Sequence, residues 1–115
     1  SSMASEADCR AAIDTLIERL GQVDQSARRK HVPDRTIGVT LLDHDVTYVG
    51  ELKSGELINV HKEPGDYRPQ VRVLCTSDDL IALTDGRLKF AHAWASGQVR
   101  LDASLRDLLR LRALA

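Results

Sequence analysis

The most informative stretch of the sequence runs Val71-Arg-Val-Leu-Cys-Thr-Ser-Asp-Asp-Leu-Ile-Ala-Leu-Thr-Asp-Gly86. Its first five residues are typical of a strand that ends at Cys75. Thr76 with Asp79 predicts a helix N-cap, because the hydroxyl accepts a backbone N–H and the carboxylate favours the positive end of the helix dipole. We expect this helix to reach about Thr84 and to stop at Gly86.

Glycine and capping residues also mark the predicted helix ends in the rest of the chain. A second short helix is predicted over residues 88–95, with a stop at Gly97, and a strand over 98–101. Ser104, with Asp107 three residues on, is expected to cap a last helix that reaches about Leu114. These helices carry mostly small and apolar side chains, which favours a wall around an apolar ligand over a reaction centre.

The preceding residues predict a helix followed by a meander of strands. An apolar stripe at helical spacing predicts a helix over 7–20, formed by Cys9, Ile13, Leu16, Ile17 and Leu20. Strands are predicted over 36–41, 46–52 and 56–61, and their short connections favour antiparallel pairing. Residues 22–34 and 62–69 read as polar or breaker-rich connections. Grouped strands followed by helices predict an α+β fold.

Bulk composition excludes several classes of protein. A chain of 115 residues is one domain by length, and its net charge of -1 argues against a nucleic-acid partner. No apolar run approaches the roughly 20 residues that span a bilayer, and no signal segment is recognisable. Two cysteines without such a signal indicate a reducing, cytoplasmic location. Ser1-Ser2 ahead of Met3 is interpreted as a tag remnant, so we expect one domain over 7–115 after a disordered segment 1–6.

From Val71 onward the chain resembles the sterol carrier protein type 2 domain, also called the nonspecific lipid-transfer domain. The resemblance rests on the ordered set Thr76–Arg87, Phe90-Ala-His-Ala-Trp-Ala-Ser-Gly97 and Gln98-Val-Arg-Leu101. The chain departs from the family in three ways: Ala103-Ser104 stands before the last helix in place of Gly-Asp or Gly-Asn, the helix after Gly86 lacks the usual Pro, and the end Ala-Leu-Ala is no peroxisomal signal.

The resemblance implies a five-stranded mixed sheet, made of the antiparallel meander plus two later strands, with helices packed on it. It also implies a small stand-alone member of bacterial type that carries a lipid. In that family fatty acids, acyl-CoA, sterols or phospholipids bind in an apolar tunnel between sheet and helices. The implied function needs no cofactor, no metal and no catalytic residue. Our candidates for the tunnel wall are apolar residues of the C-terminal helices and strands, with one tyrosine from the sheet; Phe90 and Trp94 lead because aromatics are rare here. The full set is Tyr48, Leu80, Leu83, Leu88, Phe90, Ala91, Trp94, Val99, Leu101, Leu105, Leu108 and Leu109.

Each of two basic stretches could either bind an anionic partner or be a charged surface that only water contacts. Arg28-Arg29-Lys30-His31 could meet a phosphate, a CoA or an anionic membrane surface during transient contact, and it could equally be a charged surface turn. Arg100, Arg106, Arg110 and Arg112 form a second basic stripe with the same two interpretations.

The residues give little support to an enzyme. Cys75 precedes a helix N-terminus, so it is either a thiol of lowered pKa or a small buried apolar residue. His44, His61 and His92 are scattered, and no nucleophile elbow, phosphate loop or zinc spacing appears. The alternative to a lipid carrier is a non-catalytic module with a collapsed cavity that forms a homodimer or packs against a partner enzyme.

Overall fold

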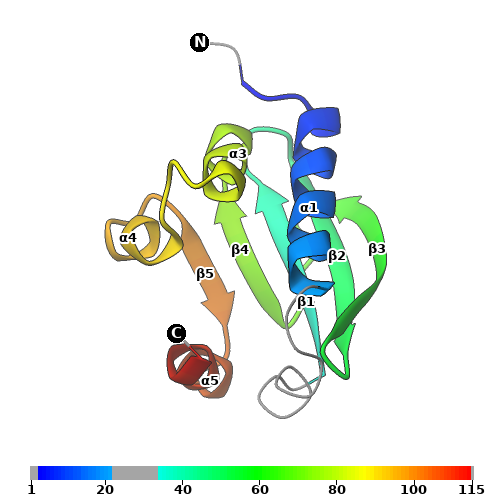
Figure 1. The fold of residues 1–115 in the computed structure, drawn as a ribbon, viewed down its shortest axis with the longest axis vertical. Helices are drawn as coiled ribbons and strands as arrows, with labels where there is room; N and C mark the ends of the chain where they lie inside the picture. Colours follow the sequence, from blue (N-terminus) through cyan, green and yellow to red (C-terminus); the bar gives the residue numbers. More distant parts are fainter. Residues whose placement is uncertain (1–2, 22–33, 115) are drawn as a thin grey trace.

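The computed structural model describes residues 3–21 and 34–114, with side chains described for 3–19 and 34–109. Along the chain the elements are α1 (Glu6–Gly21), β1 (Arg35–Leu41), β2 (Val46–Lys53), β3 (Glu56–Pro64), β4 (Val71–Cys75), α3 (Ser77–Asp85), α4 (Phe90–Ala95), β5 (Arg100–Ala103) and α5 (Leu105–Leu114) (Figure 1). The predicted order of a helix, three strands, a strand, two helices, a strand and a helix is confirmed.

The five strands form one mixed sheet in the order β3-β2-β1-β4-β5. The meander β1–β2–β3 is antiparallel, β4 pairs parallel to β1, and β5 pairs antiparallel to β4. This arrangement confirms the predicted α+β fold and its five-stranded mixed sheet. The chain leaves the meander at the edge strand β3 and returns as β4 beside β1. β1 is therefore the central strand, between β2 and β4.

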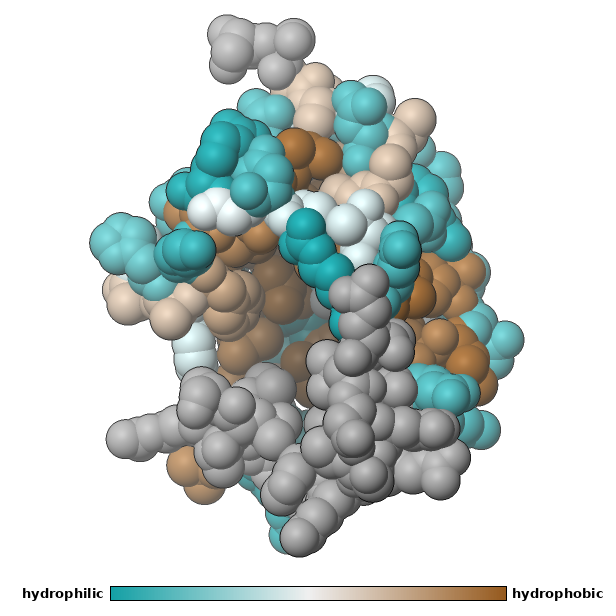
Figure 2. All heavy atoms as spheres, viewed as in Figure 1, coloured by the Kyte–Doolittle hydropathy of each residue, from teal (hydrophilic) through white to brown (hydrophobic). Residues whose placement is uncertain are grey.

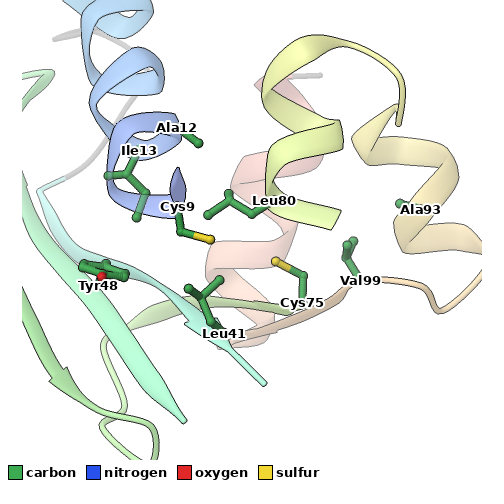
Figure 3. Packing of buried hydrophobic residues seen from close by; sticks show 9 residues of the cluster. All are labelled: Cys9, Ala12, Ile13, Leu41, Tyr48, Cys75, Leu80, Ala93 and Val99. Atoms are coloured by element: carbon green, nitrogen blue, oxygen red, sulfur yellow. The ribbon is translucent and has the colours of Figure 1, made fainter. Parts of the chain in front are cut away.

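The helices lie over one face of the sheet, which we call the helix face (Figure 1). The buried apolar cluster joins side chains of α1, β1, β2, β4, α3 and α4 on this face. Figure 3 shows Cys9, Leu41, Cys75 and Leu80 converging between α1, α3 and the sheet. Burial of this cluster supplies the main driving force for folding, since burying an apolar side chain stabilises by about 1.5–3 kcal/mol.

The opposite face of the sheet is partly covered by the segment 65–70. Thr40 and Thr47 share a hydrogen bond of 2.8 Å beneath it, and the Thr47 hydroxyl also donates to the Gly65 carbonyl at 3.3 Å. Arg72 is 8% exposed and pairs with Asp102 at 3.2 Å. This face therefore buries polar groups, most of them hydrogen-bonded, beside the apolar side chains of Val49 and Leu74, and Arg72 Nε has no hydrogen-bond partner among the described residues.

The capping predictions are confirmed. Thr76 has extended backbone and its hydroxyl accepts the Asp79 N–H at 3.2 Å, which begins α3. Gly86 ends that helix at φ 83°, a left-handed conformation that costs glycine little. Ser104 accepts the Asp107 N–H at 3.2 Å and begins α5 in the same way.

Some predicted boundaries and faces are wrong. β3 continues to Pro64, because β2 pairs with it over the whole length from Val46 onward. Leu88 lies outside α4, since its N–H donates to the Ala82 carbonyl at 3.1 Å and so closes α3. β5 begins at Arg100, because the N–H of Val99 is held by the Ala93 carbonyl at 3.1 Å.

The stripe predicted for α1 is also partly wrong. Leu16 is 37% exposed, whereas Ala12 is buried at 6%. The face that meets α3 is thus built from small residues, which lets the two helices approach closely. Leu20 has no described side chain.

The N-terminal segment is anchored earlier than expected. The Ala4 N–H donates to the Asp78 carboxylate at 3.0 Å, and its carbonyl lies 2.7 Å from His44 Nε2. Ser5 accepts the Asp8 N–H at 3.1 Å at the start of α1. Residues 3–6 were expected to be disordered, and these contacts hold the segment across α3 and the β1–β2 turn. Residues 1–2 and the basic run Arg28–His31 lie outside the described residues.

Candidate functional site

The helix face of the sheet is made of apolar rungs that cross β1, β4 and β5. Residues directly opposite each other in paired strands share a face. The register aligns Val39 with Val73, and Val73 with Leu101. The next rung aligns Ile37 with Val71, and Val71 with Ala103. A third rung pairs Leu41 with Cys75.

These rungs differ in their burial. Leu41 and Cys75 are 0% exposed beneath α1 and α3. All six members of the two lower rungs are only half-buried: Ile37, Val39, Val71, Val73, Leu101 and Ala103. Two successive rungs of a sheet are thus apolar and incompletely covered, although they face the helices. We call this surface the open floor.

Figure 2 shows a hollow with apolar residues at its bottom, between α1 on one side and α4 on the other, where β4 and β5 lie in Figure 1. Leu83 and Leu88 pack against the buried cluster from α3 and the turn that follows it. Leu108 of α5 is half-buried. Half-buried apolar side chains therefore occur on the sheet, on α3 with the turn after it, and on α5.

One ion pair fastens α5 to the sheet at the lower end of the floor. Arg35, which precedes Ile37 on the same face of β1, donates from Nε to the Asp107 carboxylate at 3.0 Å. Asp107 is only 7% exposed. On this face of β1, the fully buried Leu41 is thus followed by the half-buried Val39 and Ile37 and then by Arg35.

The predicted wall residues fall into three groups. The first belongs to the sealed cluster: Tyr48, Leu80 and Val99, with exposures of 8%, 2% and 0%. The second is half-buried: Leu83, Leu88, Leu101 and Leu108. The third is exposed: Phe90, Ala91, Trp94, Leu105 and Leu109. In the second group, Leu101 is a member of the floor, and Leu83 and Leu88 pack against the same buried cluster as Val39 and Val73. The third group lies on the helices α4 and α5.

Sequence reasoning missed most of the floor itself. Ile37, Val39, Val71 and Val73 were assigned to strands and not to a site, and Ala103 was placed between the last strand and the last helix. The alternation of Ile37, Val39 and Leu41 contained the signal, since every second residue of a strand points to the same face. Their alignment with β4 and β5 became visible only with the sheet order.

The two thiols are buried structural groups. Burial, and then the Asp79 charge, raises the pKa of Cys75 to about 12. Burial, followed by the Asp43 charge, raises the pKa of Cys9 to about 11. Cys9 Sγ donates a long bond to the Ser77 carbonyl at 3.9 Å. The alternative of a reactive Cys75 with a lowered pKa is therefore wrong, because desolvation outweighs the helix N-terminus.

The remaining polar groups near the core hold elements together. Asp43 accepts the Ser77 N–H at 2.9 Å and the Ser77 hydroxyl. Burial pushes the pKa of Asp43 upward, but the Ser77 hydroxyl and N–H outweigh it and leave the pKa lowered. The contacts tie the β1–β2 turn to the first turn of α3. Among the described residues no group of three or more His, Cys, Asp and Glu could hold a metal ion.

A second hollow, of about 530 Å³, lies between α1 and α3. Its lining includes small residues such as Ala11 and Ala12 together with the carboxylates of Asp8, Asp78 and Asp85. An acyl chain placed there would desolvate charged groups, which is costly. The open floor, which has no charged member, suits an apolar ligand better.

Solved structures of known proteins share this architecture. A crystal structure of sterol carrier protein 2 like 2 from Aedes aegypti is 20% identical, with a TM-score of 0.63 over 90% of this chain and 94% of that chain. The chain has the sterol carrier protein 2 fold. No family model and no curated protein sequence matches it significantly, so this likeness rests on structure.

Two further solved structures contain the sterol carrier protein 2 fold in different settings. One is an Aedes aegypti sterol carrier protein 2 in complex with palmitate, 14% identical, TM-score 0.62, covering 93% of each chain. The other is the inverting sec-alkylsulfatase Pisa1 from a Pseudomonas species, 23% identical, TM-score 0.53 over 74% of this chain. The present chain spans 13% of that sulfatase. The fold thus occurs both by itself and as part of a much larger enzyme.

No helix among the described residues is long and apolar enough to cross a membrane.

Proposed function

We propose that this chain binds a single molecule with a long apolar segment, of the fatty-acyl type, over the open floor. The supporting observation is the pair of successive apolar rungs that stay half-buried on the helix face. Folded proteins normally close such a surface, because each buried CH₂ contributes about 0.8 kcal/mol. A sterol carrier protein 2 that shares the fold was solved with palmitate, which is a ligand of this shape.

The energetics are sufficient without a polar anchor. A chain of ~16 carbons gains roughly 13 kcal/mol on full burial, and association and ordering remove a large part of it. The remainder supports micromolar affinity. In this proposal the half-buried Leu83, Leu88, Leu101 and Leu108 wall the ligand, together with the floor residues. The exposed Phe90, Ala91, Trp94, Leu105 and Leu109 lie at the mouth, while Tyr48, Leu80 and Val99 support the floor from within the core.

The proposal is tested by titrating delipidated protein with palmitate in a calorimeter. Two variants change the floor by different means: Val73→Trp fills it, and Leu101→Asp places a carboxylate in it. Either should weaken palmitate binding by at least about tenfold, which corresponds to 1.4 kcal/mol. Ile58→Trp is the matched control, since Ile58 is 37% exposed on β3 at the other edge of the sheet.

The leading alternative is an interaction module whose floor is covered by a partner. If wild-type protein binds none of palmitate, an acyl-CoA, a sterol or a phospholipid, the lipid proposal fails. A saturating ligand at 100 times its dissociation constant should add about 2.7 kcal/mol to the free energy of unfolding, so a thermal-shift screen would detect it. A floor variant that dissociates a dimer, with no effect of lipid, would support the module.

A further inference from the structure

The C-terminal quarter of the chain, residues 86–115, differs in charge from the rest. Residues 86–115 carry six Lys and Arg against two Asp, whereas residues 1–85 carry ten basic against fifteen acidic residues. The overall charge of -1 conceals this division. Asp102 pairs with Arg72 and Asp107 with Arg35, while of the cations of this part Arg87 pairs with Asp85. A strong asymmetry of this kind indicates an anionic partner for one side of a protein.

The same C-terminal quarter exposes its largest apolar side chains. Phe90 and Trp94, four residues apart on α4, are 39% and 41% exposed, and their ring centroids lie 6.2 Å apart. Leu105 and Leu109, four residues apart on α5, are 73% and 57% exposed. Residues four apart lie on the same side of a helix, so each helix presents one apolar pair to solvent.

These groups gather at one edge of the molecule. α4 and α5 lie near the two ends of β5, an edge strand of the sheet (Figure 1). The exposed cations Lys89 and Arg106 stand next in sequence to Phe90 and Leu105. We define the C-terminal rim as Phe90, Trp94, Leu105 and Leu109 with these two cations.

We propose that the C-terminal rim docks the protein onto an anionic lipid bilayer. Aromatic and leucine side chains flanked by Lys and Arg are the composition of interfacial helices, which bury their apolar face among the headgroups and attract acidic lipids. Tryptophan in particular favours the headgroup region. A second copy of this chain fits the rim less well, because a twofold contact would bring two cationic surfaces together.

The single tryptophan of the chain provides the assay. Protein is mixed with vesicles of equal parts phosphatidylcholine and phosphatidylglycerol, or of phosphatidylcholine alone. We expect cosedimentation with the mixed vesicles, a blue shift of Trp94 emission, and quenching of that emission by brominated acyl chains. Binding should fall as salt is added, because the attraction to the acidic lipids is screened.

Two double variants, each with a matched control, test the rim. Leu105→Ser with Leu109→Ser removes apolar groups, and Lys89→Glu with Arg106→Glu reverses the charge. Each should weaken vesicle binding by at least about tenfold. The controls are Leu42→Ser with Ile58→Ser and Lys53→Glu with Arg68→Glu, all exposed positions outside the rim. They should leave binding within about twofold of the wild type.

Clear outcomes would overturn the proposal. It fails if mixed vesicles do not sediment the protein, if the controls weaken binding as much as the rim variants, or if the rim variants instead dissociate a dimer seen by ultracentrifugation. Because the four apolar rim residues also lie at the mouth of the proposed ligand site, a floor variant is needed to separate the two proposals. Val73→Trp, which should lose palmitate, should still bind vesicles through cosedimentation, so the failure of one proposal is distinguishable from failure of the other.

Discussion

The upper and lower halves of the helix face are built from the same apolar strands but are closed to different degrees. In the upper half α1 and α3 seal Leu41 and Cys75, which are 0% exposed. In the lower half Val39, Val73 and Leu101 have equivalent positions on the strands and remain half-buried. Strand chemistry alone therefore does not distinguish a core from a binding surface. The difference lies in which helices reach each rung.

Thiol labelling tests how well the upper half is sealed, and should show the largest effect. With a pKa of about 12, the Cys75 thiolate population at a given pH is roughly a thousandfold below that of an ordinary thiol, since each pKa unit is a factor of ten. We expect both Cys9 and Cys75 to resist a disulfide reagent in native protein and to react rapidly in denaturant. Labelling in native buffer at a rate near the denatured one would show that the upper half is open as well.

Paired truncations compare the halves directly. Leu80 is 2% exposed, so Leu80→Ala should lower the free energy of unfolding by about 3 kcal/mol through lost contacts and a cavity. Leu101→Ala on the half-buried floor should cost only about 1 kcal/mol, because less of its surface leaves water on folding.

Urea denaturation of the two variants gives both values. Addition of palmitate to delipidated protein should then increase the loss of unfolding free energy caused by Leu101→Ala. The loss caused by Leu80→Ala should stay unchanged. Equal costs in the absence of ligand would mean that the floor is already filled by protein.

This contrast also explains what the sequence could reveal. Local signals are complete within a few residues: Thr76 with Asp79, Ser104 with Asp107 and Gly86 correctly marked the ends of α3 and α5. The floor depends instead on β4 returning parallel beside β1, a contact between residues more than thirty positions apart.

Burial of the helical leucines was equally hard to predict from the sequence. Leu80 and Leu105 both occupy apolar helical positions, yet one is 2% and the other 73% exposed. Helical spacing shows that a residue belongs to an apolar stripe, but it does not show whether another element covers the stripe. The predicted wall therefore mixed core, floor and rim residues.

The β1–β2 turn holds α3 over the upper half of the helix face. We expect this contact to make the free energy of unfolding depend on pH. Asp43 accepts two hydrogen bonds from Ser77 and its pKa is lowered. A carboxylate with a lowered folded-state pKa stabilises the fold above its unfolded pKa of about 4, and that contribution is lost as pH falls through the folded value. Asp43→Asn should cost about 1.5 kcal/mol at neutral pH, since bonds to a charged acceptor are the stronger ones.

Urea denaturation at neutral and acidic pH measures this contribution. The difference in free energy of unfolding between wild type and Asp43→Asn should become smaller as the pH drops below about 4. Asp45→Asn is the control: Asp45 is exposed with φ 53°, a left-handed conformation that asparagine tolerates. A gap that stays constant down to the lowest pH would show that the Asp43 charge is not what holds the turn.

The ion pair at the lower end offers the smallest expected effect, and it concerns the open half alone. Arg35 is 25% exposed at its side chain and binds Asp107 at 3.0 Å, which fastens α5 beside the floor. Arg35→Gln should cost only about 1 kcal/mol, because a partly exposed pair is screened by solvent. It should nevertheless increase the palmitate dissociation rate, since α5 would cover the ligand less securely, while Cys75 labelling stays slow. The control is Arg10→Gln, which breaks an exposed pair with Asp14 on α1. If Arg35→Gln speeds the labelling of Cys75 as much as the release of palmitate, the two halves open together and the contrast between them is wrong.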